Sequence, residues 1–359
     1  MNVSLKKLPL CKKSVGERLT ENEYIEGFER MVYNMNFSIL APGSIAASMA
    51  AAVTGLSEEY GIKCHSVASR NLERAKEFAD KWGFSKAYGS YEEMVNDPGV
   101  ELVYIASPHS LHYEHAKLCL EHGKHVLVEK AFTINAAQAE ELINLAKEKG
   151  LLLVEAIWTR FMPSRTIINE IISKRIVGKP VSLTANLGYY LQDKERLVEP
   201  SLAGGALLDV GVYPINFAMM VFEQDIARVV SCAMMSDKGV DQTNSVTLFF
   251  RGGGMAVLHS TMMTPTDRRG IIYCEEGYIE VKNINNCEGI EVYNREHELI
   301  DTCEVPKQIN GYEYEVLSCR RALMSGEIEC EEMPHAETLR VMRLLDQIRE
   351  QWGMKYPME

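Results

Sequence analysis

A charged pair at the end of an apolar run is the first feature of this sequence that suggests chemistry. The run Val126 to Val128 is followed at once by Glu129 and Lys130. Strands of a parallel sheet are buried on both faces and read as short apolar runs, so the pair is expected just beyond a strand's carboxyl end, where open α/β sheets bind ligands. At that edge Lys130 can stabilise an oxyanion, help to deprotonate a hydroxyl, or form a structural ion pair with Glu129.

A second candidate pair, Asp209 and Tyr213, lies far along the chain. The two residues are four apart in a segment that is predicted to be helical, so their side chains are expected on one face, one turn from each other. By itself the segment is typical of an amphipathic helix with a capping aspartate and a packed tyrosine. A chemical role for this pair therefore depends on what the rest of the chain indicates.

The elements that must position these residues begin with a strand at 37–40, a turn at 41–46 and an alanine-rich helix at 47–56. The turn stands where a dinucleotide-binding loop, G-x-G-x-x-[GA], is expected, and it keeps the central glycine of that motif. Glycines there let the backbone approach a pyrophosphate at a helix N-terminus. The predicted cofactor contacts lie at the centre of the turn, at Gly43, Ser44 and Ile45.

The residues after the second predicted strand, 63–69, indicate which dinucleotide is bound. An NAD-specific site carries Asp or Glu at this point to bind the ribose 2′-hydroxyl, whereas this chain has Ser69, Arg70 and Asn71. An arginine holds a 2′-phosphate through charge-assisted hydrogen bonds. We therefore predict that Ser69 and Arg70 bind NADP, with NAD as a second option. The alternative for Arg70 is an ordinary surface arginine.

Three histidines follow the next predicted strand at intervals of three. His109, His112 and His115 invite a metal-site interpretation, but no carboxylate or cysteine joins them at ligand spacing, and residues three apart drift around a helix. We therefore predict no metal site. Ser107, Pro108 and His112 are instead expected beside the cofactor.

The order of predicted elements indicates a two-domain fold. Strands and helices alternate through the first part, which is the mark of a doubly wound α/β Rossmann sheet, whereas the later part shows six strands with few helices between them. The predicted units are an extension at 1–34, with one helix at 20–33, a dinucleotide-binding Rossmann domain at 35–156, and an α+β domain at 157–359 with a large, mostly antiparallel open sheet. The last helix is expected to pack back on the first domain.

Composition excludes several other classes of protein. The 359 residues are 46% hydrophobic, which is enough for two cores, and a formal net charge of −12 disfavours binding to nucleic acid. No stretch approaches the roughly 18 apolar residues of a membrane span. The nine cysteines show no zinc-binding spacing and are expected to be reduced thiols. The expectation is a cytoplasmic protein that binds small molecules, without nucleic-acid or membrane partners.

Together these motifs resemble the Gfo/Idh/MocA oxidoreductases, a family named for glucose-fructose oxidoreductase and inositol dehydrogenase. The resemblance runs from about Met35 to the C-terminus. It rests on the altered glycine loop and on four further segments, residues 107–112, the Glu129-Lys130 pair, residues 155–161 and residues 205–214. Because tyrosine rather than histidine follows the D-x-G-x pattern, the chain looks most like the branch of dihydrodiol dehydrogenases and NADP-dependent xylose dehydrogenases.

The resemblance implies hydride transfer between a nicotinamide cofactor and a secondary alcohol or carbonyl of a sugar, polyol or vicinal diol. Lys130 and Tyr213 would share the acid–base and oxyanion roles, with the lysine lowering the tyrosine pKa, and Asp209 would orient the substrate or the lysine. Trp158 and Phe161 would line the substrate pocket. Family members commonly associate through the open sheet, so the resemblance also implies a homo-oligomer, a dimer or tetramer.

Two departures from the family pattern bear on activity. The family usually has proline after the lysine, often in a cis bond, whereas this chain has Ala131. Glu129 and Lys130 are also expected to contact the cofactor. Either the Lys130–Ala131 bond is trans and Lys130 points elsewhere, or the fold holds a non-proline cis bond. The first glycine of the loop is replaced by Ala41, and Pro42 then restricts the turn. These departures motivate an alternative function, that of a catalytically inactive relative that senses nucleotides or regulates.

Overall fold

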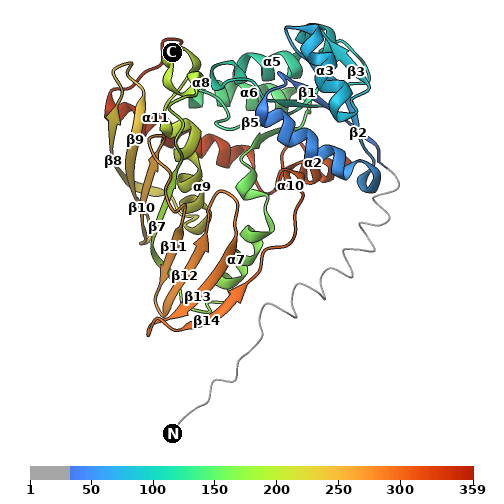
Figure 1. Ribbon diagram of the computed structural model, residues 1–359. Helices are drawn as coiled ribbons and strands as arrows, with labels where there is room; N and C mark the ends of the chain where they lie inside the picture. Colours follow the sequence, from blue (N-terminus) through green and yellow to red (C-terminus); the bar gives the residue numbers. More distant parts are fainter. Residues whose placement is uncertain (1–32) are drawn as a thin grey trace.

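The structure, a computed structural model, describes residues 33–359 and is built on two sheets (Figure 1). The predicted extension at 1–34 and its helix at 20–33 lie outside the described residues, except for Tyr33 and Asn34, which are not helical. A parallel sheet between helices comes first in the chain, and a larger, mostly antiparallel sheet follows it. The predicted fold class is therefore confirmed.

Six parallel strands form the first sheet, in the order β3-β2-β1-β4-β5-β6. This order is that of doubly wound dinucleotide-binding sheets. Every residue of β4 is buried, as expected of a strand that helices cover on both sides. The strands are β1 (Met35–Leu40), β2 (Ile62–Ala68), β3 (Lys86–Tyr88), β4 (Leu102–Ile105), β5 (His125–Glu129) and β6 (Leu153–Ala156). The helices between them are α2 (Ser44–Tyr60), α3 (Leu72–Trp82), α4 (Tyr91–Val95), η1 (His109–Leu111), α5 (His112–Glu121) and α6 (Ala136–Lys149).

Helix caps turn the chain at both edges of this sheet. The Asn71 and Asn135 side chains accept hydrogen bonds from backbone N–H groups three residues further on, and so begin α3 and α6. Gly83 and Gly150 end the same helices in the left-handed conformation, which glycine adopts without a steric penalty. Because each helix follows a parallel strand, the N-termini of α2 and α3 lie at the carboxyl edge of the sheet, where ligands of such sheets bind.

Eight strands form the second sheet, in the order β14-β13-β12-β11-β7-β10-β9-β8. Neighbouring strands are antiparallel except β7 and β10, which run parallel. β13 and β14 are additional to the six predicted strands, because β14 is mostly exposed and neither strand shows a continuous apolar run. The strands are β7 (Pro180–Gly188), β8 (Ile226–Met235), β9 (Asp241–Phe250), β10 (Met255–Thr261), β11 (Gly270–Cys274), β12 (Gly277–Lys282), β13 (Gly289–Asn294) and β14 (Leu299–Cys303).

A buried helix, α9 (Val212–Val221), packs against β7 and β10 of the second sheet. It continues a π-helical turn, η4 (Leu207–Gly211), that carries Asp209. The segment Pro200–Val221 has a mean hydropathy of 1.3 and is long and apolar enough to cross a membrane, but its most apolar window is 94% buried inside the protein. Such burial is expected of an all-apolar core helix. The remaining short helices are η2 (Trp158–Arg160), α7 (Pro163–Ser173), α8 (Glu195–Val198) and η3 (Pro200–Leu202).

The two closing helices, α10 (Glu313–Ser325) and α11 (His335–Trp352), join the two parts of the chain (Figure 1). α11 packs against both α6 and β8. On one side Arg349 donates to the carbonyl oxygen of Ile134 at 3.0 Å, and on the other Gln351 donates to a carbonyl oxygen of β8 at 3.1 Å. α10 packs against α2. These contacts hold the second sheet against the Rossmann sheet and so determine the shape of the space between them.

Candidate active site

A cleft of about 960 Å³ lies between the carboxyl edge of the first sheet and the second part of the chain. The loops after β1, β2, β4 and β5 line one side, and η4, α9 and the segment after β7 line the other. The cleft brings together the predicted catalytic residues and every predicted cofactor residue, namely Gly43, Ser44, Ile45, Ser69, Arg70, Ser107, Pro108, His112, Glu129, Lys130, Asp209 and Tyr213. The predicted substrate residues Trp158 and Phe161 do not line it.

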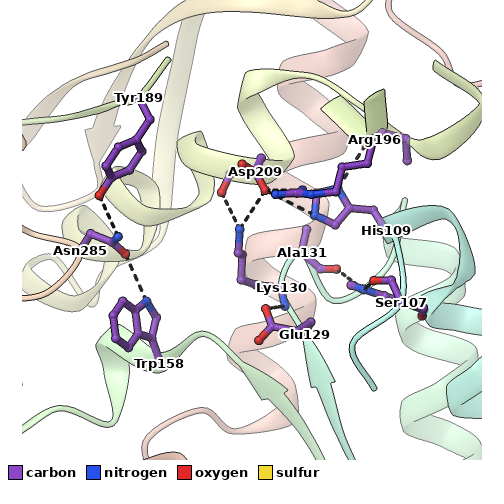
Figure 2. Close-up of polar contacts among 12 residues, drawn as sticks. Ser107, His109, Glu129, Lys130, Ala131, Trp158, Tyr189, Arg196, Asp209 and Asn285 are labelled. Carbon is purple, nitrogen blue, oxygen red and sulfur yellow. Dashed lines mark hydrogen bonds and ion pairs between the residues drawn. The ribbon is translucent and has the colours of Figure 1, made fainter. Parts of the chain in front are cut away.

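Lys130 reaches across the cleft to the second part of the chain (Figure 2). Its Nζ donates to the carbonyl oxygen of Asp209 at 2.8 Å and to the carboxylate Oδ1 of the same residue at 3.1 Å. The Glu129 side chain is not its ion-pair partner: Glu129 accepts hydrogen bonds from the Lys130 backbone N–H, at 3.2 Å, and from the Tyr104 hydroxyl. The Lys130–Ala131 peptide bond is cis, which decides between the two alternatives for this bond. The lysine therefore joins the carboxyl edge of the first sheet to the turn η4.

Asp209 is a buried carboxylate surrounded by cationic or potentially cationic groups. Its Oδ1 also accepts a hydrogen bond from Arg196 at 2.9 Å and lies 3.9 Å from Nε2 of His109. Burial on its own raises the pKa of Asp209, but Lys130 and Arg196 outweigh it and hold this pKa below its ordinary value. The carboxylate is therefore ionised at neutral pH and fixes the ammonium group of Lys130.

Tyr213 lies directly beside this ion pair. Lys130 Nζ is 5.1 Å from the centroid of the Tyr213 ring, within the range of a cation–π contact. Burial raises the pKa of Tyr213 well above its ordinary value, and Tyr312, Glu129 and Asp209 add to the increase. The expectation that Lys130 lowers this pKa is therefore wrong, because desolvation of the phenolate outweighs the nearby cation. At neutral pH Tyr213 is a protonated phenol and can act as a proton donor.

The histidines after β4 hold backbone segments around the cleft. His112 lies between two carbonyl oxygens, those of Ser107 and Ala131, each 2.8 Å from a ring nitrogen. His109 Nδ1 is 3.2 Å from the carbonyl oxygen of Ala203. Burial lowers the pKa of His112 to about 4 and that of His109 to about 3, so both rings are neutral near pH 7. The three histidines do not converge on one point, and each has its own partner.

The glycine loop keeps its shape despite its altered residues. Ala41, at the position of the first glycine, has φ 67°, in the left-handed region that glycine usually occupies. Gly43 caps α2, whose first turn carries no acidic residue. Nothing lies within 4 Å of where a Gly43 side chain would begin, so the helix N-terminus opens to the cleft. These features fit a dinucleotide pyrophosphate, which backbone N–H groups at a helix N-terminus bind.

Two arginines, rather than the one predicted, lie at the ribose end of the loop. Arg70 and Arg74 both line the cleft. Burial raises the pKa of Tyr91, and the positive charges of both arginines act to lower it, so their guanidinium groups lie near the Tyr91 hydroxyl. Arg74 also donates to the carbonyl oxygen of Pro42 at 2.7 Å. Arg74 was not predicted from the sequence. Its spacing of four residues from Arg70 is the signal that indicates it, because the cap at Asn71 begins α3 between the two arginines and places Arg74 in the first turn.

The wall opposite Asp209 consists of residues that sequence analysis did not select. Tyr189, Asn285 and Tyr312 line the cleft there, while Trp158 stands behind them, stacked on Tyr312 with ring centroids 4.5 Å apart. Phe161 lines a separate cavity of about 530 Å³, so a direct substrate contact is not supported by its position. Asn285 lies in the loop after β12, and Tyr312 lies immediately before α10. Neither residue belongs to a periodic pattern that could have indicated it.

Comparison with known proteins agrees with this geometry. The sequence pattern of the oxidoreductase family with an NAD-binding Rossmann fold matches residues 37–156, and that of the Gfo/Idh/MocA C-terminal domain matches residues 167–280. Trans-1,2-dihydrobenzene-1,2-diol dehydrogenase of Xenopus tropicalis is 33% identical over 298 residues, which is 81% of this chain and 90% of the frog enzyme. D-xylose 1-dehydrogenase (NADP(+)) of Hypocrea jecorina is 31% identical over 90% of this chain and 94% of the fungal enzyme.

Solved structures show the same fold. A 3-ketoreductase from Actinomadura kijaniata, crystallised with NADP and TDP-benzene, superimposes with a TM-score of 0.80 at 24% identity, over 89% of this chain and 98% of that enzyme. An aldose-aldose oxidoreductase from Caulobacter crescentus reaches a TM-score of 0.79 at 20% identity, over 89% and 98% of the two chains. The sequence matches, the two sheets and the shared cleft lead to one conclusion: the chain belongs to the Gfo/Idh/MocA family of oxidoreductases with an NAD-binding Rossmann domain.

Proposed function

We propose that this protein is an NADP-dependent oxidoreductase that transfers a hydride between nicotinamide and a secondary alcohol or carbonyl of a sugar, polyol or vicinal diol. One observation carries the proposal: Lys130 at the edge of the Rossmann sheet meets Asp209 and Tyr213 of the second part in the cleft that begins at the α2 N-terminus. The dihydrodiol dehydrogenase and xylose dehydrogenase relatives support the substrate classes, and the NADP named for the xylose enzyme supports the cofactor.

In this proposal Lys130 and Tyr213 act together on the substrate oxygen. A bound nicotinamide supplies the hydride or accepts it. During carbonyl reduction the Tyr213 hydroxyl, which burial keeps protonated, donates its proton to that oxygen while the ammonium group of Lys130 stabilises the developing negative charge. During alcohol oxidation the same pair takes the proton back. Asp209 is a positioning residue that holds Lys130 through two hydrogen bonds. A cofactor-monitored screen of aldoses, inositols and diols tests the proposal.

The alternative of a catalytically inactive sensor loses its motivation in this structure. Ala41 adopts a left-handed conformation, which glycine usually occupies, and Lys130 reaches Asp209 although Ala131 follows it. The curated relatives named above are all dehydrogenases. Saturable NADPH binding without turnover of any compound in the screen would restore the sensor, and failure to bind either dinucleotide would exclude both functions.

Arg70 is the proposed basis of the preference for NADP. Replacing Arg70 with alanine should raise the Kd for NADPH about 10- to 100-fold and leave the Kd for NADH nearly unchanged, because a charge-assisted bond to a phosphate contributes about 1.5–3 kcal/mol. Titration of both cofactors by fluorescence measures the two constants. Arg343→Ala, on the exposed surface of α11, is the matched control. Equal losses for NADPH and NADH would contradict the assignment to the 2′-phosphate.

The open face of the second sheet is the proposed surface for self-association. Exposed apolar side chains gather there on several strands, among them Val230 and Met234 in β8, Met255 and Val257 in β10 and Tyr273 in β11. Contiguous apolar surface of this kind on a sheet marks interfaces between proteins. The occupant we propose is a second copy of this chain, which presents the same apolar surface and so makes a two-fold contact.

A charge placed on this sheet should separate the copies. Val257→Glu is expected to convert a wild-type dimer or tetramer into a smaller species. Burying a carboxylate in an apolar interface costs desolvation free energy, and no partner charge offsets it there. Light scattering during gel filtration measures the mass. Leu72→Glu alters an equally exposed residue of α3, on the Rossmann side, and should leave the assembly intact. A monomeric wild-type protein would show that this surface has another use.

A further inference from the structure

A chain of hydrogen bonds along the wall of the cleft ends at the Tyr189 hydroxyl (Figure 2). Trp158 Nε1 donates to Asn285 Oδ1 at 3.1 Å, and Asn285 Nδ2 donates to the Tyr189 oxygen at 3.0 Å. An indole nitrogen can only donate, so the amide oxygen of Asn285 must face Trp158 and its nitrogen must face Tyr189. The direction of every bond in the chain is therefore determined.

This direction makes Tyr189 a donor toward the cleft. Its oxygen already accepts from Asn285, so its own hydrogen must point to a different acceptor. Tyr189 lines the cleft, and among the described residues none accepts a hydrogen bond from its hydroxyl. Because Tyr189 is only half-buried, water can accept this hydrogen in the empty cleft, and a substrate oxygen that displaces the water can accept it instead. The wall thus provides a place for an oxygen of the substrate.

The chain is held rigidly from behind. Trp158 is 7% exposed and stacks on Tyr312 with an interplanar angle of 10°. Gly311, at φ 101°, lets the backbone pass so close that an added Cβ would lie 2.7 Å from the Trp158 ring. The backbone N–H of Asn285 is bound by Asn283 Oδ1 at 3.2 Å. A donor fixed in this way discriminates between substrates, because it cannot turn away from one that lacks an acceptor.

We propose that Tyr189 and Asn285 are specificity-determining residues that bind a substrate hydroxyl on a carbon that is not adjacent to the reacting carbon. The inference rests on the proposed hydride transfer at Lys130 and Tyr213 and narrows its substrate class. The substrate is a polyhydroxylated ring, such as an aldose in its pyranose form, rather than a diol whose other ring carbons carry only hydrogen. The reacting hydroxyl is held at the Lys130 side of the cleft, and the second oxygen is held at the Tyr189 side.

The test compares two substrates in two variants. Wild-type enzyme with NADP should have a higher kcat/KM for D-xylose than for trans-1,2-dihydrobenzene-1,2-diol. Tyr189→Phe should lower kcat/KM for D-xylose about 5-fold, mainly through KM, and change the value for the diol less than 2-fold, since a hydrogen bond to an uncharged group contributes about 1 kcal/mol. Asn285→Asp should have the same effect, because a carboxylate would accept the Tyr189 hydrogen and turn it away from the cleft. Tyr190→Phe, on the exposed neighbour, is the control.

Deoxy analogues identify the recognised oxygen. Either 3-deoxy- or 4-deoxy-D-xylose should be a poorer substrate for the wild type than D-xylose, and the difference should disappear in Tyr189→Phe. Equal losses for sugar and diol in that variant, or a wild-type preference for the diol, would overturn the inference while leaving the hydride-transfer function in place. Absence of turnover with every compound despite NADPH binding would instead overturn the proposed function, and this inference with it.

Discussion

Replacing Lys130 with methionine is expected to lower kcat about 1,000-fold while the protein stays folded and binds NADPH. The variant loses the group that stabilises negative charge on the substrate oxygen, and positioned acid–base groups contribute about 100- to 10,000-fold to rate. The fold should persist because Asp209, the partner that methionine leaves behind, keeps its hydrogen bond from Arg196 at 2.9 Å. Steady-state kinetics, a thermal melt and a cofactor titration measure the three quantities separately.

The outcome separates catalysis from structure. Lys117→Met serves as the control, because Lys117 forms an ion pair with Glu141 on the exposed surface. An unchanged kcat in Lys130→Met would remove this lysine from the mechanism. A variant that no longer binds NADPH would assign Lys130 to the cofactor rather than to the substrate oxygen.

Replacing Asp209 with asparagine is expected to lower the free energy of unfolding by about 3 kcal/mol near neutral pH, the low end of the cost of leaving a buried charge without its partner. The low end applies because the Lys130 side chain, at 13% exposed, retains some contact with solvent. We also expect kcat to fall, since the amide holds the ammonium group of Lys130 less firmly than the carboxylate. Urea unfolding and steady-state kinetics measure both effects.

The pH dependence of this loss provides a second test. Lys130 and Arg196 hold the pKa of Asp209 below its ordinary value against the effect of burial. A carboxyl whose pKa is lower in the folded state adds stability that is complete above its unfolded pKa, about 3.9, and is lost as the pH falls toward the native value. The difference between wild type and Asp209→Asn should therefore be constant from pH 7 to 5 and shrink below pH 4. A difference that stays constant to pH 3 would contradict this account, and Asp237→Asn, at an exposed site, should show no difference at any pH.

Local patterns were sufficient for the Rossmann sheet and for the residues at its edge. Buried parallel strands appear as apolar runs, and the residue after such a run must lie at the carboxyl edge, so Lys130 and Arg70 could be placed without coordinates. The four-residue spacing of Asp209 and Tyr213 likewise kept both on the cleft side. These inferences depend only on the periods of strands and helices, which are properties of short segments.

The strands at one edge of the second sheet, β13 and β14, were not predicted from the sequence. β13 alternates polar and apolar residues over a short length, and β14 is mostly exposed, so the apolar signal of both strands is weak. Their pairing with β12 is what makes them strands. The neighbouring strands supply the hydrogen bonds that the local sequence cannot indicate.

Which side chains meet inside the cleft was decided by tertiary structure alone. Lys130 pairs with Asp209, 79 residues away, and not with its sequence neighbour Glu129. Burial, which no short segment specifies, raises the pKa of Tyr213 although a lysine lies beside it. Asn285 lines the cleft, and Trp158, 127 residues earlier in the chain, lies behind it and donates a hydrogen bond to its side chain. Such partners come from distant segments, and their contacts form only when the two sheets are packed together, whereas periodicity reports only what a residue's near neighbours in sequence impose.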